Sequence, residues 1–152
     1  MARSREISYQ TTLYVRDQCL CLHAQGAARA LARRFDEAFR TLELTNGQFS
    51  LLTALNRPQP PAMGSVAALL AMDRTTLTAA LKPLQRRGWV VSSPDLNDRR
   101  NRLLSLTQAG RNLLAQAVPV WEATHGKVEE QLTARGGKRM RSSLRALCAA
   151  AP

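Results

Sequence analysis

Apolar residues repeat every three or four positions along most of the chain, a spacing that is typical of amphipathic helices. The pattern predicts helices over residues 8–42, 45–55, 64–71, 74–87, 107–134 and 138–150. In the first of these, the continuous apolar run Cys19–Leu22 precedes the helically spaced apolar residues that include Phe35 and Phe39. The helix is therefore apolar on more than one face. One small domain rarely buries such a helix on every side. We therefore expect the first helix and the terminal helices to pack against a second copy of the chain.

Local signals mark where several of these helices begin and end. Thr45 and Gln48 have the spacing of a capping box at the start of the second helix. Pro58–Pro61 should end that helix, because proline cannot continue one. In the third helix, Leu69 and Leu70 are expected to face inward.

Proline and glycine also interrupt the later helices. Pro83 lies inside helix 74–87, where it removes a backbone hydrogen bond and should kink the helix. Whether that kink aims the threonine-rich half of the helix at a partner is left open. Pro119 and Gly126 predict a bend within helix 107–134, and Gly136-Gly137 predicts a break before the last helix.

The segment from Met72 to Thr107 combines a two-faced helix with a hairpin. Leu77, Leu81 and Leu84 share the face that can pack on a core. The other face carries hydrogen-bonding groups and cations, namely Arg74, Thr75, Thr76, Thr78, Lys82 and Arg86. Gly88 supplies the stop, since it tolerates the positive φ found after a helix.

Two short apolar runs after Gly88 predict a small β-hairpin. Trp89–Val91 and Leu103–Leu106 have the composition of strands, and Pro94–Asp98 has that of a turn. Arg99, Arg100 and Arg102 place three cations beside the turn. The fold class that follows is mainly α with a small β wing.

Charge and composition narrow the partner. The chain has 152 residues with 45% hydrophobic content and a net charge of +11, from 22 Lys and Arg against 11 Asp and Glu. That excess indicates a polyanionic partner. No apolar run approaches the ~18 residues of a membrane span, and MARSREISYQ lacks the apolar core of a secretory signal. We therefore expect a cytoplasmic protein that does not associate with a membrane.

The arrangement of the charge favours double-stranded DNA over other polyanions. The major groove admits one α-helix, and the minor groove attracts inserted arginine. A helix with a polar face beside an arginine-tipped hairpin supplies both contacts. The simpler alternative is a solvated helix followed by a polar hairpin.

These motifs resemble the MarR family of winged helix-turn-helix transcriptional regulators in order and spacing. The resemblance is carried by Leu44-Thr45-x-x-Gln48-Phe49, Met72-Asp73-Arg74-Thr75-Thr76-Leu77-Thr78, Leu84-x-x-x-Gly88-Trp89-Val90, Asp95-x-x-Asp98-Arg99-Arg100 and Leu106-Thr107-x-x-Gly110. It implies a winged helix-turn-helix at residues 44–107 and dimerisation helices at 1–43 and 108–152. It also implies a homodimer on a pseudo-palindromic operator, most often as a repressor.

The resemblance assigns roles within the DNA-binding surface. Arg100, backed by Asp98, would enter the minor groove, and Arg99 would meet phosphate. Lys82 is also expected to contact a phosphate. Thr75, Thr76 and Thr78 are expected to lie near base edges.

The family also implies an effector site between the dimerisation helices and the DNA-binding lobe. Small aromatic or lipophilic anions are the expected ligands, and the candidate residues are His23, Phe49, Trp121 and His125. The alternative is that Trp121 belongs to the core and His125 is exposed.

Cysteine chemistry gives a second hypothesis. Cys19, Cys21 and His23 form a C-x-C-x-H pattern, but alternate residues of a helix point apart and cannot converge on one metal. Cys19 and His23 are four apart and could touch, which would activate the thiol. Cys21 matches by position the sensing cysteine of the organic-hydroperoxide repressor subfamily, although Gln25 and Phe35 stand where its tyrosines would fall.

Other function classes find little support. The sequence has two histidines and lacks the H-E-x-x-H, G-x-S-x-G and G-x-x-x-x-G-K-[ST] patterns, so no enzyme and no cofactor is expected. A regulator triggered by oxidation of Cys21 and a non-specific architectural DNA binder remain as alternatives.

Overall fold

A computed structural model describes residues 7–98 and 100–149. The N-terminal part is two helices, α1 (Tyr9–Gln18) and α2 (Leu20–Ala38), followed by a short 3-10 helix, η1 (Arg40–Leu42). The expectation of one helix over residues 8–42 was therefore wrong. The break lies at Cys19, whose backbone is extended at ψ 104° and whose sulfur accepts the N–H of Leu22 at 3.4 Å as the N-cap of α2.

The middle part of the chain begins with α3 (Asn46–Leu55) and α4 (Met63–Leu69). The capping box is confirmed, because Thr45 accepts the N–H of Gln48 and the Gln48 side chain accepts the N–H of Thr45. The third helix ends two residues earlier than expected, and Ala71 turns the chain with φ +50°. Leu69 was expected inside but is 59% exposed, since it lies at the rim of a cavity described below.

The next elements are α5 (Arg74–Arg86) and the antiparallel strands β1 (Val90–Pro94) and β2 (Arg102–Leu106). The helix agrees with the expected range and runs through Pro83. The hairpin is confirmed, but Trp89 precedes β1 and Pro94 pairs with Arg102 inside the sheet rather than in the turn. A bridge between Ala62 and Leu103 ties the chain before α4 to the hairpin.

The C-terminal part consists of α6 (Gln108–Glu129) and α7 (Gly136–Ala149). Gly136-Gly137 does not break the chain, because both residues start α7 and the turn falls at Arg135, with φ +73°. A Cβ at Gly137 would lie 3.0 Å from the carboxyl carbon of Glu129, so the end of that side chain would have to shift to admit it.

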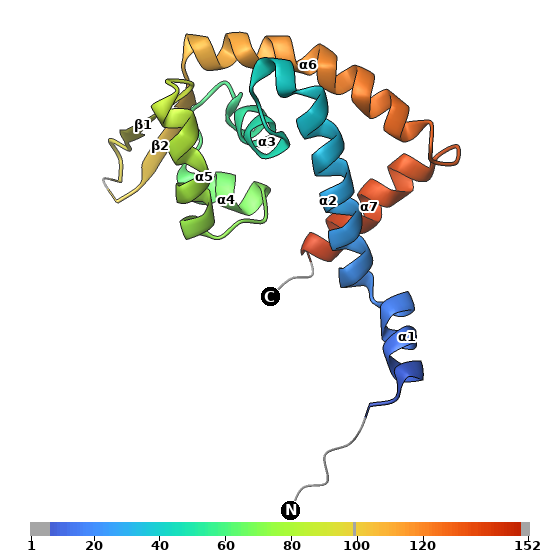
Figure 1. Ribbon diagram of the computed structural model, residues 1–152. Coiled ribbons are helices and arrows are strands. Elements are labelled where there is room, and N and C mark those ends of the chain that lie inside the picture. The colour runs from blue at the N-terminus through green and yellow to red at the C-terminus, as the bar shows by residue number, and fades with distance from the viewer. Residues whose placement is uncertain (1–6, 99, 150–152) are drawn as a thin grey trace, which may run out of the picture.

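The helices and the hairpin form a lobe and an extension (Figure 1). α6 arches away from the lobe of α3, α4, α5 and the hairpin and leads to α7, while α1 projects away from the rest of the chain. The core gathers around Phe39, Leu52, Leu77, Leu81 and Leu104, so it lies where α2, α3, α5, α6 and β2 meet. None of the helices described has both the length and the apolar character that crossing a lipid bilayer requires.

Candidate nucleic-acid interface

The first turn of α5 is fixed by Asp73. Its carboxylate accepts the backbone N–H of Thr76 at 2.8 Å and the hydroxyl of Thr76 at 2.7 Å. These bonds, the backbone one foremost, hold the pKa of Asp73 below its ordinary value. The partial positive charge at the N-terminus of a helix also stabilises a carboxylate there. Asp73 therefore fixes the start of α5 as its N-cap.

One face of α5 is buried and the opposite face is open. Leu77, Leu81 and Leu84 are fully buried, as their spacing predicts. The six polar residues expected on the other face are all exposed: Arg74, Thr75, Thr76, Thr78, Lys82 and Arg86. A shallow cleft of about 290 Å³ runs along this face. The structure therefore leaves free the face that the sequence assigns to DNA.

The C-terminal end of α5 is anchored to the chain after α2. Gly88 has φ +69°, as expected for the residue that stops the helix. The Arg87 guanidinium lies 4.8 Å from the ring centre of Trp89 and donates to the carbonyl oxygen of Glu43 at 3.0 Å. This contact was not anticipated from sequence, because 44 residues separate Arg87 from Glu43.

Side-chain hydrogen bonds shape the tip of the wing. Asp95 accepts the N–H of Asn97 at 2.9 Å, and Asp98 accepts the N–H of Arg100 at 3.0 Å. Asp98 also accepts the amide of Asn101 at 3.0 Å. Asp98 thus organises the backbone that carries Arg100, which is exposed. Arg99 lies outside the residues that the structure describes.

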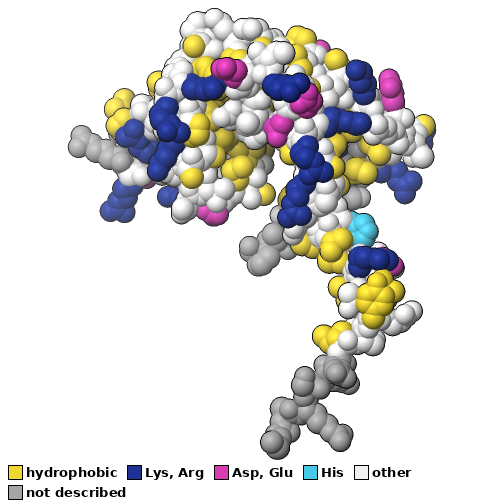
Figure 2. Space-filling model, viewed as in Figure 1, with side chains coloured by type: hydrophobic (Ala, Val, Ile, Leu, Met, Phe, Trp, Pro, Cys, Tyr) yellow, Lys and Arg dark blue, Asp and Glu magenta, His cyan; other side chains and the backbone are white. Residues whose placement is uncertain are grey.

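Arg102 has a different role from Arg100. Its guanidinium donates to the Ser92 hydroxyl at 2.9 Å and to the Ser92 carbonyl oxygen at 3.0 Å, across the hairpin. Arg102 therefore braces the wing, while Arg100 is exposed on it. Figure 2 shows Lys and Arg side chains gathered over this lobe and continuing along α2.

The structure brings together three of the four candidate effector residues. Phe49 and Trp121 stack with ring centres 6.4 Å apart, and Trp121 stacks on His125 at 4.6 Å. Phe49 and Trp121 line a cavity of about 720 Å³ between α3, α4 and α6. None of the other residues that line this cavity was proposed from the sequence as an effector contact. They are Ser50, Thr53, Ala54, Asn56, Arg57, Leu69, Leu70, Leu114 and Val118.

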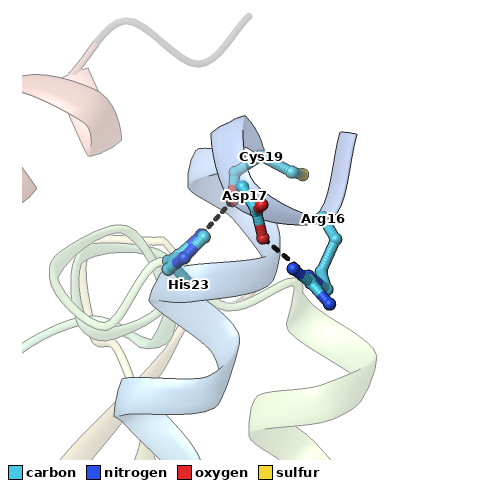
Figure 3. A network of polar contacts seen from close by, with 4 residues as sticks. All are labelled: Arg16, Asp17, Cys19 and His23. Carbon is cyan, nitrogen blue, oxygen red and sulfur yellow. Dashed lines mark hydrogen bonds and ion pairs between the residues drawn. The ribbon is translucent and has the colours of Figure 1, made fainter. Parts of the chain in front are cut away.

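His23 lies away from this cavity, at the junction of α1 and α2 (Figure 3). Its Nδ1 bonds to the carbonyl oxygen of Cys19 at 2.8 Å, beside the ion pair of Arg16 with Asp17. The expected contact of His23 with the Cys19 thiol is therefore wrong, because the sulfur already caps α2.

The three cysteines are free. The amide of Gln25 donates to the sulfur of Cys21 at 3.1 Å, and Arg29 donates to the Gln25 carbonyl oxygen at 3.1 Å. Gln25 thus occupies a place beside the thiol, and Cys21 is exposed. Within the described ranges, no three His, Cys, Asp or Glu side chains are placed to hold a metal ion.

Comparison with known proteins agrees with this architecture. The sequence profile of the MarR family matches residues 44–101, which run from α3 through β1 and end just before β2. The transcriptional regulator MosR of Mycobacterium tuberculosis, crystallised in complex with DNA, superimposes with a TM-score of 0.79 at 33% identity, over 88% of this chain and 96% of that one. The chain belongs to the MarR family.

Two further similar proteins are a transcriptional activator and a transcriptional repressor. The transcriptional activatory protein BadR of Rhodopseudomonas palustris is 37% identical over 91 residues, 56% of this chain and 51% of that protein. The repressor CouR bound to a 23-mer DNA duplex superimposes with a TM-score of 0.73 at 26% identity, over 95% of this chain and 99% of that one. The chain spans about half the length of several curated transcriptional regulators that it matches.

Proposed function

We propose that this protein is a sequence-specific, DNA-binding transcriptional regulator that acts as a homodimer. The observation that carries the proposal is the pairing of the open face of α5 with the projecting Arg100 of the wing. The helix would read base edges in the major groove, while Arg100 would enter the adjacent minor groove. Repression by occupying a promoter is the proposed mode.

The dimer is proposed from apolar surface that the single chain leaves open. α1 and α7 pack little against the other described elements. Large apolar side chains are exposed on α1, α2 and α7, and they are Tyr9, Tyr14, Val15, Leu20, Leu22, Leu31, Met140, Leu144 and Leu147. Exposed apolar side chains in this number favour an interface with another chain. A two-fold dimer would bind two half-sites about one helical turn apart.

The test is selection of DNA by the purified protein. A randomised duplex pool should yield an inverted repeat, bound at least ~1,000-fold more tightly than shuffled DNA at the same salt concentration. Affinity should fall steeply with salt, because phosphate contacts release counterions. Equal affinity for selected and shuffled duplexes would instead support an architectural DNA binder.

We propose the cavity between α3, α4 and α6 as the effector site. Its walls are apolar except for Ser50, Thr53, Asn56 and Arg57. Nε of Arg57 donates to the Ala54 carbonyl oxygen at 3.0 Å, which holds the guanidinium at the cavity. A planar aromatic acid would place its ring against Phe49 and Trp121 and its carboxylate at Arg57.

An effector acts only if it favours one state of the dimer. We expect it to stabilise a spacing of the two α5 helices that no longer fits the half-sites. Benzoate, 4-hydroxybenzoate and 4-coumarate are suitable probes, and a bound one should raise the thermal midpoint and weaken DNA binding. Arg57→Gln should remove the response to the acids but not to their uncharged amides. An equal response to both in Arg57→Gln would contradict the role of Arg57.

Oxidation of Cys21 is the second candidate trigger, because its sulfur is exposed. A hydroperoxide would be attacked by the thiolate at its outer oxygen, giving a sulfenic acid and releasing an alcohol. DNA binding before and after cumene hydroperoxide should then differ in the parent and stay unchanged in Cys21→Ser. Equal release in Cys21→Ser would eliminate this trigger.

A further inference from the structure

Two threonines on the open face of α5 donate their hydroxyl hydrogens to acceptors within the protein. A threonine hydroxyl has one hydrogen to donate. That of Thr76 goes to the Asp73 carboxylate at 2.7 Å, and that of Thr78 goes to the carbonyl oxygen of Arg74 at 2.7 Å. Thr78 also lies 3.9 Å from the sulfur of Met63, but a thioether is the weaker acceptor. Neither hydroxyl is therefore a free donor to a base.

Thr75 differs from both of them. In the part of the chain that the structure describes, no hydrogen bond of its hydroxyl occurs, so its hydrogen is available. The three threonines, which look equivalent in the sequence, thus present different chemistry. Thr75 offers a donor, whereas Thr78 offers a methyl group and an oxygen lone pair.

The surroundings of Thr78 favour its methyl group as the contact. Thr78 and Ala79 line the 290 Å³ cleft, and Arg74 and Lys82 are among its other walls. All four residues are exposed. The lining of the cleft therefore includes the small apolar groups of Thr78 and Ala79, with a cation one helical turn away on either side of Thr78.

Among the bases, only thymine carries a methyl group on its major-groove edge. We propose that the γ-methyl of Thr78, together with the side chain of Ala79, reads the 5-methyl group of a thymine in each half-site. This inference rests on the proposed function. The flanking cations would contact phosphate or guanine on either side, and the hydrogen bond to the Arg74 carbonyl oxygen restricts rotation of the Thr78 side chain.

The competing hypothesis assigns the base contact to the Thr78 oxygen. With its hydrogen engaged, that oxygen could only accept, and the amino groups of adenine and cytosine are the donors in the groove. Thr78→Ser keeps the oxygen and loses the methyl group, while Thr78→Val keeps a methyl group and loses the oxygen. The two substitutions therefore separate the readings.

The experiment uses the duplex that the wild-type protein selects from a randomised pool. Each thymine of one half-site is replaced in turn by deoxyuridine, which removes only the 5-methyl group. At one position the wild type should lose affinity about fourfold, as expected for one buried methyl-sized group. Thr78→Val should show the same loss at that position, and Thr78→Ser should show none. Thr41→Ser, which trims an exposed threonine outside α5, should behave like the wild type.

Three results would overturn the inference. The first is a wild-type protein that is insensitive to deoxyuridine at every position, and the second is full sensitivity in Thr78→Ser. The third is a Thr78→Val variant that loses the deoxyuridine effect while its thermal midpoint stays unchanged, since that result assigns the contact to the oxygen. A wild-type protein that selects no sequence contradicts the proposed function itself, and the two failures are thereby distinguishable.

Discussion

Gly110 packs directly against the carbonyl group of Trp89. A Cβ at position 110 would overlap the carbonyl oxygen of Trp89 and lie 3.1 Å from its carbonyl carbon. Around this contact, Thr107 donates its hydroxyl to the Gly88 carbonyl oxygen at 2.6 Å and caps α6 by accepting the N–H of Gly110. The Leu106-Thr107-x-x-Gly110 motif is thus the joint between the wing and α6.

Gly110→Ala should destabilise the fold by about 3 kcal/mol, because a methyl group is forced against backbone atoms that cannot move aside. Gly126→Ala is the matched control, since it lies in the same helix with nothing within 4 Å of the added Cβ. That control should be neutral or stabilising by up to about 1 kcal/mol. Urea unfolding of both variants measures the difference. Equal stabilities would show that the joint can relax.

Arg100→Ala should weaken binding to the selected duplex at least about fivefold while the thermal midpoint stays constant. The reason is that Arg100 projects from a wing whose shape is set by Asp95 and Asp98 rather than by Arg100 itself. Fluorescence anisotropy at fixed salt measures the loss. Arg139→Ala removes the same charge from α7, and an equal loss in that variant would assign the effect to net charge instead of the minor groove.

Much of the DNA-binding lobe could be predicted because local signals and packing agree there. Leu77, Leu81 and Leu84 repeat at helical spacing and are buried, and Thr45 with Gln48 forms the capping box. Each of these features depends on residues within one or two turns. A pattern in the sequence can therefore specify them.

Other features depend on contacts that a pattern does not contain. At the break between α1 and α2, the sulfur of Cys19 accepts a backbone N–H. No proline or glycine beside Cys19 marks this break in the sequence. Leu69 looks like a core residue in a helical row but forms the rim of a cavity. Gly137 looks like a helix breaker, yet it lies inside α7, beside the carboxylate of Glu129. In each case the tertiary partner, rather than the local sequence, decides the role.

The ion pair between Glu129 and Arg141 should make the docking of α7 sensitive to acid. The hydrogen bond from Arg141 lowers the pKa of Glu129 below its ordinary value of 4.5. A lowered pKa in the folded state means that the pair stabilises the fold above pH 4.5 and that this contribution disappears as the pH falls through the lowered value.

Arg141→Gln should therefore lower the thermal midpoint at pH 7, and its difference from the wild type should shrink as the pH falls below 4.5. Arg139→Gln removes a neighbouring charge of α7 that has no ion pair among the residues described. It should show no such pH-dependent difference. Thermal unfolding between pH 7 and pH 3 checks both variants, and a constant gap for Arg141→Gln would contradict the pair's contribution.

Leu144→Glu should convert the proposed dimer into single chains. Leu144 is 46% exposed on α7, where a second copy would bury it, and an unpaired carboxylate is costly to bury. Light scattering should give a mass near the chain's 16.8 kDa instead of twice that value. Affinity for the selected duplex should fall steeply, since each chain then holds one half-site without the help of the other.

Leu96→Glu is the control for that change. It introduces the same charge at a leucine that is 95% exposed, but at the tip of the wing, outside the proposed interface. This variant should keep the mass of two chains. A wild-type protein that has the mass of one chain, or a Leu144→Glu variant that remains paired, would contradict the use of α7 in the dimer. Because the half-site spacing depends on pairing, a wild-type protein with the mass of one chain would also remove the reason to expect an inverted repeat.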